Sequence, residues 1–244
     1  MLIKDLDDKL SNIVGNYFKN LEKEVRLHIN LFCYLFTVIE KEFVYKHFVD
    51  YDINIIYWVI LFHDLAKFIC IHPYEKNDKF ALRDYMHPYK SSLLFIENLI
   101  EKNRINLDKQ NLDIFKEKYN NFKNLIFDSY LKEEYNNGYI INIKCFDDII
   151  KYIKYLRSLG ENNNWFCDAF ILIIFHQNLP NNEKYMNKIL LTKKQIKEVF
   201  DLRLLEMMRI IMVLDSLSYQ IFDPNEWVYQ INKHLDEVRA YLSQ

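Results

Sequence analysis

The sequence predicts an all-α fold, and three observations support that prediction. The 244 residues include only 3 Gly and 4 Pro, too few for the many tight turns of a β-sandwich or barrel. Apolar residues recur at helical spacing, and no segment alternates convincingly over six residues. Hydrophobic residues make up 50% and charged residues 27% of the chain, so we expect one globular domain with a substantial core over residues 1–244.

In the first part of the chain, periodicity predicts three helices. The first covers residues 7–20. The second is the stretch EVRLHINLFCYLFTVIEKEF, whose apolar residues lie on nearly every side and so indicate a core position. The third covers about 54–68. The stretch that follows, CIHPYEKNDKFALRDYMHPYK, holds two prolines, two histidines and many charges, which indicates an irregular segment beside a functional site.

The rest of the chain is also predicted to be helical. One helix starts near Pro88, because proline suits the first turn. Residues 106–137 are charged and helical in pattern, which suggests an insertion over about 103–140 packed on the outside, and NNGY reads as a turn. Further helices are predicted over 146–158, 165–176, 194–219 and 225–242. The expected core therefore covers about 22–220, with 225–242 as an amphipathic C-terminal helix.

Composition limits the cellular compartment and the classes of binding partner that we expect. The net charge is −2, with 32 basic and 34 acidic residues, which gives no electrostatic footprint for duplex nucleic acid. The four cysteines form no CxxC, which favours buried, reduced thiols in a cytoplasmic protein. MLIKDLDDKL lacks the apolar core of a signal peptide. The longest apolar run, INIIYWVILF, has 10 residues, whereas a membrane span needs about 20. We therefore expect a cytoplasmic protein without a membrane segment.

The stretch LFHDLAKF places His63 and Asp64 side by side in an otherwise apolar run. His28 and His176 likewise follow apolar residues on helices that should be mostly buried. A buried imidazole needs partners for both nitrogens, and a buried carboxylate needs a cation or strong donors. A shared cation would satisfy them together. Asp215, in IIMVLDSLSY, is a second acid at the end of an apolar run, with a helix cap or a salt bridge as the alternative.

The chemistry of these side chains points to a transition metal. Imidazole with carboxylate suits iron, manganese, nickel, cobalt or zinc and does not suit calcium. The set contains no thiolate, which weakens a structural zinc site. Adjacent residues on a helix diverge by about 100°, so His63 and Asp64 reach one metal if it sits over the groove between their directions. Asp64 could then bridge to a second metal.

The other histidines have weaker claims. His47 and His234 lie among charges near predicted helix ends, where surface positions are expected. His72, beside Pro73, is expected to belong to a structural turn, with a place on the rim of the site as the alternative.

Taken in chain order, these residues resemble the HD phosphohydrolase superfamily, whose pattern is a histidine, a His-Asp pair, further histidines and a closing aspartate on consecutive helices. HDLAK is similar to the family's HD-x-x-K/R form, HPYKSS to the segment around its next histidine, ILIIFHQN to the helix that ends in one or two histidines, and VLDSLS to its closing helix. The resemblance covers about 27–218. It implies an HD-domain-like helical bundle with a helical insertion between the third and fourth histidine motifs.

The resemblance also implies two metal sites that share one carboxylate. The first would be held by His28, His63, Asp64 and Asp215, and the second by Asp64, His87 and His176. Two features depart from the family's pattern. Members with full dinuclear sites often have a histidine pair where this chain has His176 and Gln177, and the loss of one imidazole could weaken the second site. The charged stretch before His176 also exceeds the spacing of the smallest members, so His176 is the least secure assignment.

The activity implied by the resemblance is that of a metal-dependent phosphohydrolase or phosphodiesterase. One or two divalent transition metal ions (Mn, Fe, Ni, Co or Zn) would activate water to cleave a phosphoester of a nucleotide, cyclic nucleotide or oligonucleotide. Asp64 and Lys67 are the expected catalytic residues. Lys67 lies one turn after Asp64 and could contact a phosphate oxygen, with an ordinary helix-end lysine as the alternative. Lys90 and Ser91, near a predicted helix N-terminus, are expected to bind substrate, and Arg83 is a weaker candidate.

Two further functions stay open at this point. A stand-alone HD domain of this length also resembles the HD nuclease of CRISPR interference systems, which cuts single-stranded DNA. It predicts a basic groove with exposed aromatics, which KYIKYLRS and KEKYNNFKNL could supply. The other is a catalytically reduced nucleotide-binding regulatory module, for which Gln177 is the motive. The C-terminal helix could support a homodimer or a protein partner, or simply close the core.

Overall fold

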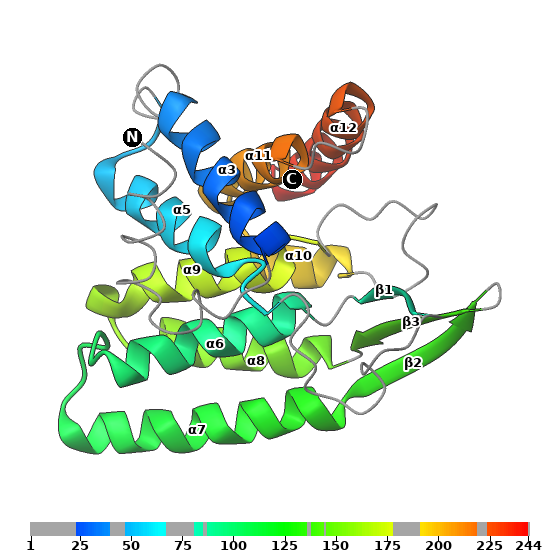
Figure 1. Cartoon of the computed structure of the whole chain (residues 1–244). Helices are drawn as coiled ribbons and strands as arrows, with labels where there is room; N and C mark the ends of the chain where they lie inside the picture. The colour runs from blue at the N-terminus through cyan, green and yellow to red at the C-terminus, as the bar shows by residue number, and fades with distance from the viewer. Residues whose placement is uncertain are drawn as a thin grey trace.

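The body of the protein is a bundle of α-helices, which confirms the predicted all-α fold class (Figure 1). The computed structural model describes residues 23–39, 47–66, 81–84, 87–135, 138–143, 145–177, 191–218 and 224–243. Figure 1 shows α3, α11 and α12 above a stack that contains α9, α6, α8 and α7, with a small sheet at one side. The predicted helix over 7–20 lies outside the described residues.

The centre of the bundle is α9 (Asn164–Phe175), whose main contacts within the described chain are with four other α-helices. All of its residues from Phe166 to Phe175 are buried, because the run FCDAFILIIF is apolar on every face except at Asp168. The four neighbours are α5 (Asp50–Phe62), α6 (His87–Glu101), α8 (Phe146–Arg157) and α11 (Leu202–Ser218). Two further helices pack against α11, namely α3 (Lys23–Ile39) and α12 (Pro224–Leu242).

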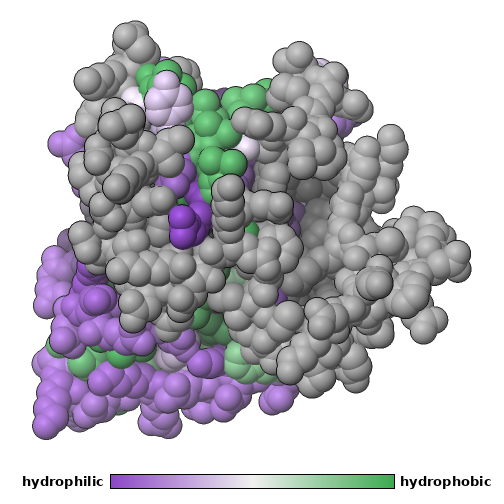
Figure 2. Space-filling view, in the orientation of Figure 1, coloured by the Kyte–Doolittle hydropathy of each residue, from purple (hydrophilic) through white to green (hydrophobic). Residues whose placement is uncertain are grey.

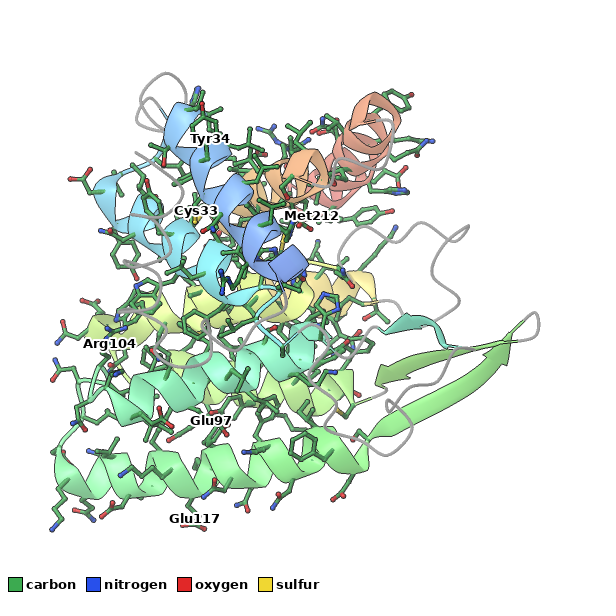
Figure 3. All side chains as sticks on the ribbon, viewed as in Figure 1. Cys33, Tyr34, Glu97, Arg104, Glu117 and Met212 are labelled. Carbon is green, nitrogen blue, oxygen red and sulfur yellow. The ribbon has the colours of Figure 1, made fainter. Side chains whose placement is uncertain are left out.

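The predicted insertion begins with α7 (Lys109–Asp128), which covers the outside of α6 and α8. Its inner face buries Phe115, Tyr119, Phe122 and Ile126 at helical spacing, and the ring of Phe122 stacks on Tyr152 at 4.1 Å between centroids. The Tyr119 hydroxyl donates to a carboxylate oxygen of Glu97 at 2.8 Å; Figure 3 shows Glu97 pointing from α6 toward α7. The outer face of α7 is hydrophilic (Figure 2). The helical character of residues 109–128 was therefore predicted correctly.

A small three-stranded sheet was not predicted. Its order is β1 (Ala81–Asp84), β3 (Gly138–Ile143), β2 (Tyr130–Tyr135), with β1 parallel and β2 antiparallel to β3. Residues 130–135, expected to continue the helix, are thus a strand. The signal lies in YLKEEY and GYIINI, which are rich in aromatic and β-branched residues and separated by two asparagines. The charges in the first run masked its strand character.

Two helix boundaries also differ from the prediction. The expected single helix over 194–219 is two helices, α10 (Lys193–Val199) and α11. Phe200 is extended between them (φ −105°, ψ 140°), and the Asp201 carboxylate accepts from the Leu204 N–H at 2.7 Å to start α11. The expected helix over 54–68 ends at Phe62, and residues 63–66 form turns. His63 and Asp64 therefore follow α5 and do not sit within it.

Three cysteines of the described part of the chain, Cys33, Cys145 and Cys167, are free and buried, as predicted; Cys70 lies outside it. Burial raises the pKa of the Cys33 and Cys167 thiols to about 12, so they are unreactive packing groups. None of the described helices combines the length and the apolar character that crossing a bilayer requires. His47 is exposed and His234 is half-buried.

Helix α10 begins with a capping box, in which the Thr192 hydroxyl oxygen accepts from the Gln195 N–H at 3.2 Å and the Gln195 side chain accepts from the Thr192 N–H at 2.8 Å. We expect Thr192→Ala to lower the free energy of unfolding by about 1 kcal/mol, because one helix N–H loses its acceptor. Urea unfolding would measure the change. Thr192→Ser keeps the acceptor and is the matched control; equal losses in both variants would contradict the capping role.

Candidate metal site

The first group of predicted ligands comes together where α3, the end of α5 and α11 meet. Nε2 of His28 lies 2.9 Å from Oδ1 of Asp215 and 3.3 Å from Oδ2 of Asp64. Nε2 of His63 lies 3.3 Å from the same Asp215 oxygen and 3.2 Å from Nε2 of His28. All four ligand atoms lie within 4.8 Å of one another. The turn after α5 lets His63 and Asp64 enter this group together.

The second group shares Asp64 with the first. Oδ1 of Asp64 lies 3.1 Å from Nε2 of His87, at the start of α6, and 3.9 Å from Nε2 of His176, at the end of α9. These three ligand atoms also lie within 4.8 Å of one another. The two oxygens of Asp64 therefore face different groups: Oδ2 contacts the first and Oδ1 the second. All six predicted metal ligands are brought together, in the two sets that the sequence resemblance implies.

The far nitrogens of two of these histidines are held by backbone carbonyl oxygens. Nδ1 of His63 lies 2.9 Å from the Ile60 carbonyl, and Nδ1 of His176 lies 2.7 Å from the Ile173 carbonyl. A carbonyl only accepts, so both Nδ1 atoms carry the proton. In the neutral ring Nε2 then presents a lone pair to the centre of the cluster. Donating the second ring N–H to a carbonyl is the usual arrangement of a histidine that ligates a metal.

This arrangement concentrates electron pairs in a buried space. The Nε2 atoms of His28 and His63 lie so close together that a proton or a cation must sit between them. Both atoms also face the carboxylates of Asp64 and Asp215. Among the described residues, Nε2 of His176 makes no hydrogen bond. Imidazole and carboxylate donors with this convergence suit a divalent transition metal. The buried His/Asp group could therefore hold a metal ion.

The ionisation of the site follows from burial and from its charges. Burial alone would lower the pKa of His63, but the charge of Asp64 and the contact with Asp215 outweigh it, so the net shift is upward. Burial, with His63 and His87 nearby, lowers the pKa of His176 to about 3. Burial alone would raise the pKa of Asp215, but His28 and His63 hold it well below its usual range. His176 is thus neutral, as ligation requires, and Asp215 is ionised.

A comparison with known proteins gives no family for this chain: no family model, no curated protein and no solved structure matches it. The candidate metal site is therefore supported by the geometry and chemistry of its side chains alone. The resemblance to the HD superfamily stays a prediction from the sequence motifs.

The predicted substrate-binding residues are placed less completely than the ligands. Lys67 and His72 lie outside the described residues, and Arg83 lies in β1, where only the backbone is described. Lys90 and Ser91 are buried in the first turns of α6. The Ser91 hydroxyl oxygen accepts from the Ala66 N–H at 3.1 Å, which holds the turn after Asp64 against α6. Phosphate contact by these residues stays a prediction.

One contact of the site was not predicted from the sequence. The Ser218 hydroxyl oxygen lies 2.7 Å from Nδ1 of His28 and 2.6 Å from the Asp215 carbonyl oxygen. Ser218 follows Asp215 by one helical turn in VLDSLS, so the spacing places both on one side of α11. That spacing was the available signal.

Proposed function

We propose that this chain is a metal-dependent phosphohydrolase or phosphodiesterase, which cleaves a phosphoester of a nucleotide, cyclic nucleotide or oligonucleotide by attack of water. The observation that carries the proposal is the position of Asp64, whose two oxygens face two different histidine-containing groups. A carboxylate shared between neighbouring cation sites is the arrangement that a two-metal hydrolase needs. Manganese, iron, nickel, cobalt and zinc all fit the donors.

Bound cations would supply an activated water and positive charge beside the phosphoryl oxygens. The contacts among the protein's own residues hold the metal-binding side chains in place. Carbonyl contacts fix His63 and His176, and Asp64 lies between the groups with a side chain that is 1% exposed. Asp215 is the most exposed ligand, with 18% of its side chain accessible against 6% for His28. We therefore expect substrate to approach past Asp215. Lys67, three residues after Asp64 in the sequence, would contact a phosphate oxygen as a point charge.

The proposal is tested by measuring metal content and turnover of a chromogenic phosphodiester on the same purified protein, with manganese, nickel or cobalt added. Transition metal in the protein together with turnover supports it. A folded protein that binds none of these ions and leaves the diester intact would sink it. Degradation of single-stranded DNA in preference to mononucleotides would select the nuclease. Nucleotide binding without turnover would select a regulatory module, for which Gln177 remains the motive.

Metal removal should destabilise the fold, because the ligands come from α3, α6, α9, α11 and the turn after α5. A metal that binds only the folded chain adds about 2.7 kcal/mol at a free concentration 100 times its Kd. We expect a chelator to lower the melting temperature and Mn²⁺ or Co²⁺ to restore it. Calcium serves as the control, since it prefers all-oxygen sites. Equal stabilisation by calcium would argue against a histidine-based site.

A further inference from the structure

Ser218 connects two predicted ligands of the first group. It is 5% exposed, on the last turn of α11, and it contacts both the backbone of Asp215 and the ring of His28. The Asp215 carbonyl oxygen can only accept, so the single hydroxyl proton of Ser218 goes to it. The Ser218 oxygen must then accept at its other contact, 2.7 Å away. Nδ1 of His28 is therefore the protonated nitrogen of that ring.

The consequence appears on the other side of the ring. With the proton on Nδ1, Nε2 of neutral His28 carries a lone pair, and Nε2 is the atom that lies 2.9 Å from Asp215 and 3.3 Å from Asp64. The corresponding nitrogens of His63 and His176 are held by backbone carbonyls, which no substitution at Ile60 or Ile173 removes. For His28, the atom that accepts from Nδ1 is the side-chain hydroxyl oxygen of Ser218.

We infer that Ser218 is a positioning residue for the metal site: its hydroxyl fixes the orientation and the tautomer of His28 and ties that ligand, on α3, to Asp215, on α11. The inference rests on the proposed metal site and deepens it, because it names the residue that sets one ligand's protonation. An outer partner of this kind typically changes metal affinity about 10–100-fold when it is removed.

The test uses the full chain with His87→Ala as the parent, so that the second group lacks one of its three donors. Affinity for Co²⁺ or Mn²⁺ is measured by competition with a chromophoric chelator in the parent and after adding Ser218→Ala or Ser218→Thr. We expect Ser218→Ala to weaken binding about 10–100-fold and Ser218→Thr, which keeps the hydroxyl, to recover most of it. Ser216→Ala, a half-buried serine on the same helix, is the matched control and should leave binding unchanged.

An affinity in the Ser218→Ala variant within about twofold of its parent would overturn the inference. A second measurement separates this outcome from failure of the proposed function. In the metal-free wild-type chain, at alkaline pH where the ring is neutral, the ¹⁵N shifts of His28 should report a proton on Nδ1, and Ser218→Ala should remove that preference. If the parent binds no metal but this difference appears, the proposed metal site fails, while the control of the His28 tautomer by Ser218 stands. If His28 carries no Nδ1 proton in the wild type, the role of Ser218 fails.

Discussion

The proposed function predicts that replacing Asp64 with alanine removes both proposed metal ions at once and abolishes turnover of a phosphodiester. Asp64 is the one ligand common to both groups, with Oδ2 3.3 Å from His28 and Oδ1 3.1 Å from His87. Cation charge supplies several kcal/mol of transition-state stabilisation, so we expect turnover to fall by at least about 100-fold. Metal content by mass spectrometry and turnover of a chromogenic diester, measured on the same samples, check both effects.

Single-group variants sharpen this prediction. His87→Ala takes a donor from the second group only and should leave one ion bound, whereas Asp215→Ala takes a donor from the first group only. Asp113→Ala, an exposed carboxylate on α7, is the control for loss of an acid and should change neither readout. Circular dichroism shows whether each variant is folded. An Asp64→Ala protein that kept the wild-type metal content would mean that Asp64 is a buried acid paired with histidines and no bridging ligand.

The residues that come together in the two His/Asp groups could be predicted from sequence because their local contexts are informative. A histidine or an aspartate at the end of an apolar run, as in WVILFHD, ILIIFH and MVLD, is expected to be largely buried, and several such groups in one domain favour a common partner. The division into two groups that share Asp64 was implied by the resemblance to the HD superfamily. The point at which α5 ends could not be predicted from the periodicity of the sequence. The helix ends at Phe62, and the turn that follows places both His63 and Asp64 in the first group.

The parts that escaped prediction depend on tertiary contacts. The small sheet pairs β1 in parallel with β3, across a separation of more than fifty residues, and local pattern does not encode such a partner. The contact of Ser218 with His28 joins α11 to α3 and is equally non-local. Asp168 was overlooked because the ten-residue run around it is apolar, and its partner, Arg203, lies on another helix. The sequence therefore indicated which residues are buried, whereas the residues that they contact could be identified only from the tertiary structure.

Arg203 lies at the start of α11 and holds two buried carboxylates from different helices. Its Nη1 donates to Oδ1 of Asp52, on α5, at 2.6 Å, and its Nη2 contacts Asp168, on α9. The carboxylate side chains are 7% and 10% exposed, whereas that of Arg203 is 38% exposed. Burial raises the pKa of Asp168, and Arg203 opposes that shift. Without the guanidinium, two acids from neighbouring helices would be left buried beside each other.

We expect Arg203→Met to lower the free energy of unfolding by about 2–3 kcal/mol at pH 7, somewhat less than for a fully buried pair because Arg203 is partly solvated. The loss should shrink as the pH falls. An acid whose pKa is raised in the folded state binds more protons folded than unfolded, so acidification favours folding of the variant relative to the wild type. Urea unfolding at pH 7 and at about pH 5 measures both effects. Arg239→Met is the control: its side chain is 57% exposed and 3.5 Å from Glu206, so we expect at most about 0.5 kcal/mol.

Adding Asp52→Asn and Asp168→Asn to Arg203→Met should restore much of the lost stability, because the buried charges that need the guanidinium are gone. A triple variant as unstable as Arg203→Met would show that the arginine acts through packing. The metal site offers an independent check. Arg203 and Asp215 are on the same helix about 18 Å apart, and effects at that separation usually add. The stabilisation by Co²⁺ or Mn²⁺ should therefore be equal in the wild type and in Arg203→Met. A smaller increment in the variant would mean that the ion cluster at one end of α5, α9 and α11 sets the ligand geometry at the other.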